Sequence, residues 1–186
     1  MVRGVMKHVI RWTILGGLGL MVGAGPLTAL PPGLRLGPPR EVAVSAGAFD
    51  PFVENQTVEI GGEVRFAPRH LGIFPRVLPE LAPTFGMVAT GKGTLYAYSG
   101  LRAELPVGRR WTLSPSVGVG LFRKSDDFTL GGPLEFRSGF ELAWRLPSGS
   151  RLGLTLYHLS NSGIYNRNPG SESLVFTYSA PLGRGR

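Results

Sequence analysis

The chain has no cysteine in its 186 residues, which excludes a disulfide-stapled scaffold, a thiolate zinc site and a cysteine nucleophile. Charged residues are also scarce, at 17% against roughly 25% in an average soluble domain. The chain has no block of lysine and arginine that would suggest nucleic-acid binding. The 28 glycines disfavour a helical bundle, and the length suits one domain with a core of its own.

Long apolar runs are absent except for a short one near the start. Residues 1–29 begin with three basic residues and no acid, continue with an apolar run over residues 12–22, and then contain Ala24 and Ala29. This order predicts a secretory signal peptide cleaved near Ala24 or Ala29. The alternative, an anchor that is not removed, is disfavoured because the run is shorter than the ~20 residues that span a bilayer. Residues 30–186 are then expected to form a single domain.

The remaining chain alternates between apolar and polar residues, which is typical of strands that have two different environments. In the segment 133–146, for example, Leu134, Phe136 and Phe140 share one face, and Glu135 and Arg137 share the other. The alternation predicts eight strands, over residues 41–49, 57–67, 76–90, 93–105, 111–123, 133–146, 151–160 and 171–180.

Two all-β architectures fit this pattern, a soluble sheet protein and a membrane barrel. Without a spanning helix, a chain crosses a membrane only as a closed barrel. The strands are close to the 9–11 residues that cross a bilayer at a tilt, as in ~10-residue barrel segments. Their polar faces mix glutamate and arginine with glycine, as a filled lumen would, and the chain begins with a predicted export signal. We therefore predict an eight-stranded antiparallel transmembrane β-barrel of the bacterial outer membrane.

Strand parity brings three polar residues to the predicted lipid face. If the N-terminus is periplasmic, the seventh strand ends and the eighth begins at the outer rim. His158 and Ser160 then share the outward face of one strand, and Glu172 shares that of the next. A simpler interpretation treats all three as interfacial residues that lead into a loop, where a polar side chain costs little free energy. A hydroxyl beside an imidazole that a carboxylate orients is also the arrangement of a serine hydrolase. No group of His, Asp and Glu has metal-ligand spacing, so no metal is expected.

The stretch around these residues resembles the signature of the lipid A 3-O-deacylase family, the PagL enzymes. The resemblance rests on His158-Leu-Ser160-Asn161, followed by Asn168-Pro-Gly170 and then Glu172. It implies an eight-stranded outer-membrane barrel whose lipid-facing triad hydrolyses the ester-linked acyl chain at position 3 of lipid A. By position, Ser160 is the nucleophile, His158 the base and Glu172 the orienting acid. Asn161, Asn168 and Gly170 are expected to support the site and its oxyanion.

The same interpretation assigns a substrate surface and partners. The expected acyl-chain groove is bounded by apolar residues of the last two strands, with a loop arginine near the lipid A phosphates: Leu154, Leu156, Leu174, Phe176 and Arg167. The expected partners are lipid A or lipopolysaccharide and the outer-membrane lipid, with no cofactor and no nucleic acid. Two alternatives remain open: a non-enzymatic structural or adhesive barrel, and another acyl-modifying enzyme such as a palmitoyltransferase or phospholipase. The sequence also leaves open whether the chain forms a homodimer.

Overall fold

The computed structural model describes residues 36–52, 56–69, 80–126 and 128–183, so the predicted signal peptide lies outside the described residues. All regular structure in the described residues is β-strand. No helix in this part of the chain is long and apolar enough to cross a membrane. The strands are β1 (Pro39–Phe49), β2 (Thr57–Phe66), β3 (Leu81–Thr90), β4 (Leu95–Ala103), β5 (Leu105–Val107), β6 (Trp111–Arg123), β7 (Leu134–Arg145), β8 (Arg151–Ser160) and β9 (Ser171–Pro181).

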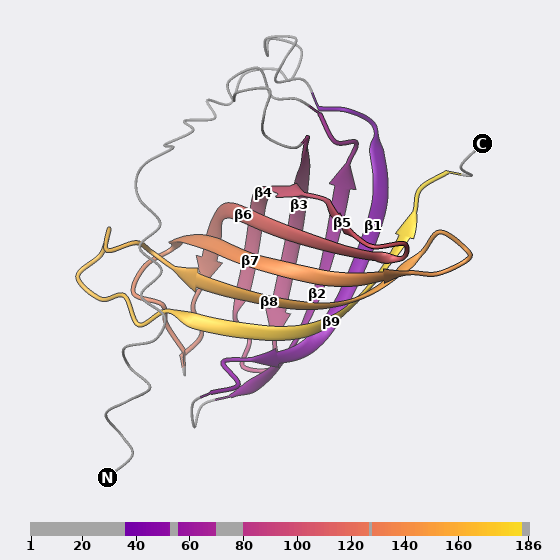
Figure 1. The fold of residues 1–186 in the computed structure, drawn as a ribbon. Coiled ribbons are helices and arrows are strands. Elements are labelled where there is room, and N and C mark those ends of the chain that lie inside the picture. Colours follow the sequence, from indigo (N-terminus) through magenta and orange to yellow (C-terminus); the bar gives the residue numbers. More distant parts are fainter. Residues whose placement is uncertain (1–35, 53–55, 70–79, 127, 184–186) are drawn as a thin grey trace.

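The strands close into a single antiparallel barrel (Figure 1). Each long strand pairs with its neighbours in sequence, and the first, β1, also pairs with the last, β9, from Glu41 opposite Pro181 to Phe49 opposite Ser173. The pairing of β4 with β6 completes the circle. With the short β5 counted as a continuation of β4, the barrel has eight strands, which confirms the predicted fold.

The fourth predicted strand, 93–105, is interrupted in the structure. β4 ends at Ala103 and β5 begins at Leu105, yet both pair with β6 in one register, Arg102 opposite Ser116 and Leu105 opposite Leu113. That register sets Pro115 opposite Ala103. Because proline has no amide hydrogen, the ladder loses a bond there and the strand divides. The third predicted strand, 76–90, is seen from Leu81 onwards, and residues 76–79 lie outside the described residues.

The outer wall is apolar and the interior is charged, the reverse of a soluble barrel. Large apolar side chains stand exposed along the strands, such as Ile60, Leu121 and Phe176, of which Phe176 is 75% exposed. Buried glutamates, arginines, serines and threonines line the inside. The period-two alternation produces this arrangement directly, because successive side chains point to opposite faces of a strand. An apolar outer band around a polar lumen is the pattern of a transmembrane barrel.

Ion pairs fill the half of the lumen next to the start of β1 and the end of β9. Glu141 accepts from Arg65 at 2.7 Å and from Arg102 at 3.0 Å. Arg65 also binds Glu63 at 2.6 Å. Arg151 makes a close pair with Glu41 and a second pair with Glu104. These charges come from strands all around the barrel, so the network ties opposite walls together.

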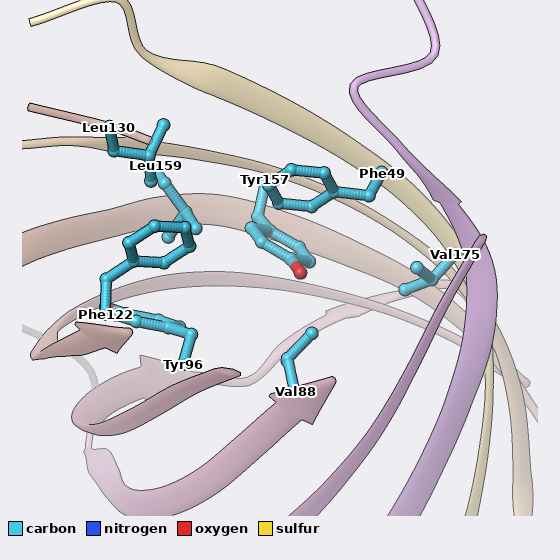
Figure 2. Packing of buried hydrophobic residues seen from close by; sticks show 8 residues of the cluster. All are labelled: Phe49, Val88, Tyr96, Phe122, Leu130, Tyr157, Leu159 and Val175. Atoms are coloured by element: carbon cyan, nitrogen blue, oxygen red, sulfur yellow. The ribbon is translucent and has the colours of Figure 1, made fainter. Parts of the chain in front are cut away.

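In the other half of the lumen, aromatic side chains fill the space instead of ion pairs. Arg137 lies over the ring of Tyr157, with 4.1 Å between its guanidinium carbon and the ring centre. Tyr157 donates its hydroxyl to Glu59, which also accepts from Ser173 at 2.6 Å. Beyond this level, an apolar cluster closes the lumen (Figure 2). Its members are Phe49, Val88, Tyr96, Phe122, Leu130, Tyr157, Leu159 and Val175.

The lumen therefore leaves little free space. A cavity of about 40 Å³ remains among the described residues, lined by Glu63, Arg102 and Arg137 together with apolar residues such as Met87 and Val88. A space of this size and polarity suits a few water molecules rather than an acyl chain. Any large lipid substrate must therefore meet the protein from outside the barrel.

The first prediction tests the role of Glu141. Glu141→Gln keeps the shape of the side chain but leaves two buried guanidinium groups without their shared carboxylate. Removing one partner from a buried ion pair costs about 3–5 kcal/mol, so we expect the free energy of unfolding to fall by that order in a denaturant titration of the membrane-inserted barrel. The control, Asp126→Asn on an exposed loop, should change it by less than about 0.5 kcal/mol. Equal effects of the two substitutions would contradict a supporting role for the ion pairs.

Candidate active site

The pairing of β8 with β9 sets His158 directly opposite Glu172. The two side chains meet on the outer surface, where Nδ1 of His158 lies 3.1 Å from Oε1 of Glu172. They are 43% and 42% exposed, whereas their neighbours Tyr157, Leu159 and Ser173 are buried inside the barrel. The predicted outward direction of the pair is therefore observed. Because an ionised carboxylate only accepts hydrogen bonds, Nδ1 carries the proton and Nε2 is left as the basic nitrogen.

Ser160 is the last residue of β8 and shares the outward face of His158, two positions along the strand. It lies opposite Phe136 of β7 and just beyond the last residue of β8 that pairs with β9. Its hydroxyl forms no hydrogen bond with His158 among the described residues. A catalytic hydrogen bond is often loose without substrate and tightens when substrate binds. The structure thus brings the three residues to one place and shows the contact between His158 and Glu172 only.

Gly170 lies beneath the imidazole. Its φ of +69° is in the left-handed region, where glycine is favoured. A Cβ at this position would lie 2.9 Å from Cε1 of His158 and 3.5 Å from Nε2. Gly170 therefore lets the chain return into β9 and also leaves room for the ring.

Asn161 organises the loop that follows Ser160. Its side chain is fully buried, and its amide nitrogen donates to the carbonyl oxygens of Leu130 at 2.9 Å and Arg167 at 2.8 Å. Its side-chain oxygen accepts from the amide of Gly163 at 3.0 Å. Both hydrogens of the amide group are thus occupied. Of the predicted supporting residues, Asn161 holds the loop in place and has no spare side-chain donor for an oxyanion.

Asn168 approaches the main chain next to the candidate nucleophile. Its side-chain oxygen accepts from the backbone amide of Asn161 at 3.0 Å, and Asn161 directly follows Ser160. The Asn168 side-chain nitrogen has no hydrogen-bond partner within the part of the chain that the structure describes. The loop therefore presents a free donor close to Ser160.

Two further contacts at the site do not follow from the alternating pattern. The backbone amide of Asp50 donates to the carbonyl oxygen of Glu172 at 2.7 Å, which extends the β1–β9 ladder past Phe49. Burial raises the pKa of the Asp50 carboxyl, and the nearby charge of Glu172 raises it further. The hydroxyl of Tyr165 accepts from the amide of Leu134 at 3.2 Å, which fastens the loop to β7. Both contacts join segments distant in sequence, and no local motif marks them.

The expected substrate surface is a row of exposed or half-buried apolar side chains below the His158–Glu172 pair. Leu156 lies opposite Leu174, and Leu154 lies opposite Phe176, in the same register as the pair. Arg167 is exposed in the loop above. Among the described residues, no group of three or more His, Asp or Glu side chains is placed to hold a metal ion.

Comparisons with known proteins point to one family. The family model described as lipid A 3-O-deacylase (PagL) matches residues 92–181, which include every residue of the candidate site except Asp50. Residues 92–181 are thus similar to the PagL family. A curated relative, the lipid A deacylase PagL of Bordetella bronchiseptica, is 30% identical over 84 residues, which is 41% of this chain and 47% of that protein. The chain thus spans about half the length of the curated relative it matches.

A solved structure supports the fold. The crystal structure of the outer membrane enzyme PagL aligns with a TM-score of 0.59 and 19% sequence identity. The alignment covers 76% of this chain and 99% of that structure. Together, the closed barrel and the PagL relatives indicate an outer-membrane β-barrel.

The second prediction concerns the contact between Gly170 and His158. Gly170→Ala strains the backbone and pushes the ring, whereas the control Gly163→Ala (φ +79°, with open space at its Cβ) only strains the backbone. We expect imidazole ¹⁵N shifts to report the Nδ1-protonated tautomer in the wild type and in Gly163→Ala, and its loss in Gly170→Ala. Both variants should lose about 1–2 kcal/mol of stability from the left-handed backbone. An unchanged His158 signal in Gly170→Ala would show that the ring does not depend on this glycine.

Proposed function

We propose that this chain is an outer-membrane esterase that removes the 3-O-linked acyl chain of lipid A through Ser160, His158 and Glu172. The observation that carries the proposal is the hydrogen bond between His158 and Glu172 on the apolar outer wall, with Ser160 two residues away on the same strand face. A structural role explains this pair poorly, because exposed ion pairs contribute little stability. The match of residues 92–181 to the PagL family supports lipid A as the substrate.

The first chemical step in the proposed mechanism is acyl transfer to serine. Nε2 of His158 takes the proton of Ser160 while the Ser160 oxygen attacks the ester carbonyl carbon. Glu172 holds Nδ1–H and stabilises the imidazolium that forms. When the tetrahedral intermediate collapses, the sugar oxygen at position 3 leaves and takes the proton from His158. The acyl chain is then an ester of Ser160.

Water completes the cycle. His158 deprotonates a water molecule that attacks the acyl-serine, and the proton returns to Ser160 as the free fatty acid leaves. The 42–43% exposure of the His158 and Glu172 side chains supports access of water from the membrane surface. The site includes the last residue of β8, at the level where the outer headgroups meet the acyl chains in the proposed orientation.

Asn168 is the proposed side-chain donor to the oxyanion. Its oxygen accepts from the amide of Asn161, the residue after Ser160, and its nitrogen has no hydrogen-bond partner among the described residues. Such a preorganised donor lowers a barrier by about 2.7–4 kcal/mol. Asn161 and Gly170 support the reaction indirectly, by fixing the loop and by making room for the imidazole.

The substrate is proposed to lie along the outer wall. The row formed by Leu154, Leu156, Leu174 and Phe176 leads away from the His158–Glu172 pair towards the middle of the barrel. It offers an apolar track for the acyl chain, while Arg167 at the rim can pair with a phosphate of lipid A.

The third prediction tests the nucleophile. Ser160→Ala should abolish the loss of one hydroxyacyl chain from lipid A, with a fall in rate of at least about a thousandfold, as measured by mass spectrometry of lipid A from cells that express the barrel. The matched control is Ser162→Ala, two residues further into the loop, which should keep wild-type activity. Lipid A that gains an acyl chain would favour a transferase. An unchanged profile with the wild type would favour a non-enzymatic barrel.

The fourth prediction separates two roles of Asn168. Asn168→Asp keeps the oxygen that accepts from Asn161 but removes the free N–H donors, whereas Asn168→Ala removes both. If Asn168 stabilises the oxyanion, both variants should lose about 100- to 1,000-fold in kcat, and Asn166→Ala should not. Substantial activity in Asn168→Asp alone would mean that the residue only positions the loop.

A further inference from the structure

Two tryptophans stack on the rim of the barrel that lies opposite the candidate active site. Trp111, the first residue of β6, pairs with Trp144 near the end of β7. Their ring centres are 6.0 Å apart with an angle of 21° between the planes, and both rings are close to half exposed. This rim also carries the end of β9 (Figure 1).

The tryptophans belong to a continuous row of exposed apolar side chains around the wall. Val107 pairs with Trp111, Trp111 with Trp144, Trp144 with Leu152, and Leu152 with Tyr178. All five are exposed, so the row crosses strands β5 to β9 without a gap. A belt that contains tryptophan and tyrosine marks the level where acyl chains meet headgroups.

Three arginines lie just beyond this row. Arg109 and Arg110 are in the turn before Trp111. Arg145, the last residue of β7, follows Trp144 and stands exposed at the mouth of the barrel, with the inward parity of Glu141 and Ala143. The amide of Arg145 donates to the carbonyl oxygen of Arg110 at 2.8 Å, so the two turns are adjacent. All three arginines are exposed, and none forms an ion pair with another described residue. Residues 105–110 and 145–150 contain no acidic residue.

We propose that a patch on this rim binds the headgroup of an anionic phospholipid in the inner leaflet of the outer membrane. This inner-rim patch consists of Arg109, Arg110, Arg145, Trp111 and Trp144. Guanidinium groups bind phosphate oxygens in a bidentate manner, and the tryptophans hold the rim at the depth where that phosphate lies. The continuous apolar row directly below the arginines favours a lipid over a soluble anion, because a lipid fills both parts of the surface at once.

The inner-rim patch is independent of the proposed esterase. It lies at the opposite end of the barrel from His158 and Glu172, so it faces the other leaflet of the bilayer. The lumen arginines do not contribute to it, because Arg151, the cross-strand partner of Arg145, is buried and paired with Glu41 and Glu104. The inference depends on the outer-membrane barrel and its orientation, and a failure of the deacylase proposal leaves it untouched.

The chain is well suited to a direct test because its only other tryptophan is Trp12. In the full chain with Trp12→Phe, fluorescence reports on the inner-rim patch alone. The protein is inserted into phosphatidylcholine vesicles that contain phosphatidylglycerol, with brominated acyl chains on one lipid or on the other. Because bromine quenches tryptophan only at short range, the ratio of the two quenching efficiencies measures which lipid is enriched beside the patch.

We expect phosphatidylglycerol to be enriched about two- to fivefold around the wild-type patch, in keeping with the attraction of an arginine to an anionic surface. The triple variant R109Q/R110Q/R145Q should bring the ratio to about one. The matched control K92Q/R123Q/K124Q removes three charges at the opposite rim and should keep the wild-type ratio.

Three results would overturn the inference. The first is equal quenching by both lipids in the wild type, and the second is an undiminished ratio in the inner-rim variant. The third is an equal fall in the control variant, which would indicate a general charge effect. A salt series on the wild type provides a test without any arginine substitution. The enrichment should weaken as salt rises, and an enrichment that does not respond to salt would also contradict arginine binding.

Discussion

Charges that this chain turns away from its apolar wall lie in a narrow lumen, where an unpaired charge costs several kcal/mol. Glu135 is buried there without an ion-pair partner among the described residues, but the glutamates and arginines nearer the rim opposite the candidate active site form a connected set. In this set Glu141 pairs with Arg65 and Arg102, and Arg151 pairs with Glu41 and Glu104. The rest of the structure depends on this network, because it joins opposite walls and leaves no passage for a lipid.

A filled lumen moves any lipid chemistry to the outer wall. There a polar side chain is costly unless it lies near the rim, and the His158–Glu172 pair is at the end of two strands. The loops above it are held by contacts that have nothing to do with the strand pattern. Asn161 ties its loop to Leu130, and Leu130 is itself buried in the apolar cluster that closes the lumen (Figure 2). The loop of the candidate site is therefore anchored to the cluster that closes the lumen.

The two rims of the barrel differ in their chemistry. The outer rim carries the loops that cover the lumen and shape the His158–Glu172 site. The opposite rim has short turns before β6 and β8, a stacked pair of tryptophans, and three arginines without an acidic partner among the described residues. This asymmetry matches a bilayer whose two leaflets have different lipids, a glycolipid on one side and phospholipids on the other. One barrel can thus present a separate surface to each leaflet.

The amino-acid sequence by itself determined the strands, the polarity of their faces and the outward direction of His158, Ser160 and Glu172, because these follow from a period of two residues that needs no distant contact. It also contained the spacing by which the chain resembles the PagL signature. Only the tertiary structure decided the partners across the barrel, such as Glu141 with Arg65, and the gap between β4 and β5. The tertiary structure also decided the different hydrogen bonds of Asn161 and Asn168 and the contact between Asp50 and Glu172. These depend on which strands and loops meet once the barrel closes, and strand closure joins residues whose separation along the chain carries no local signal.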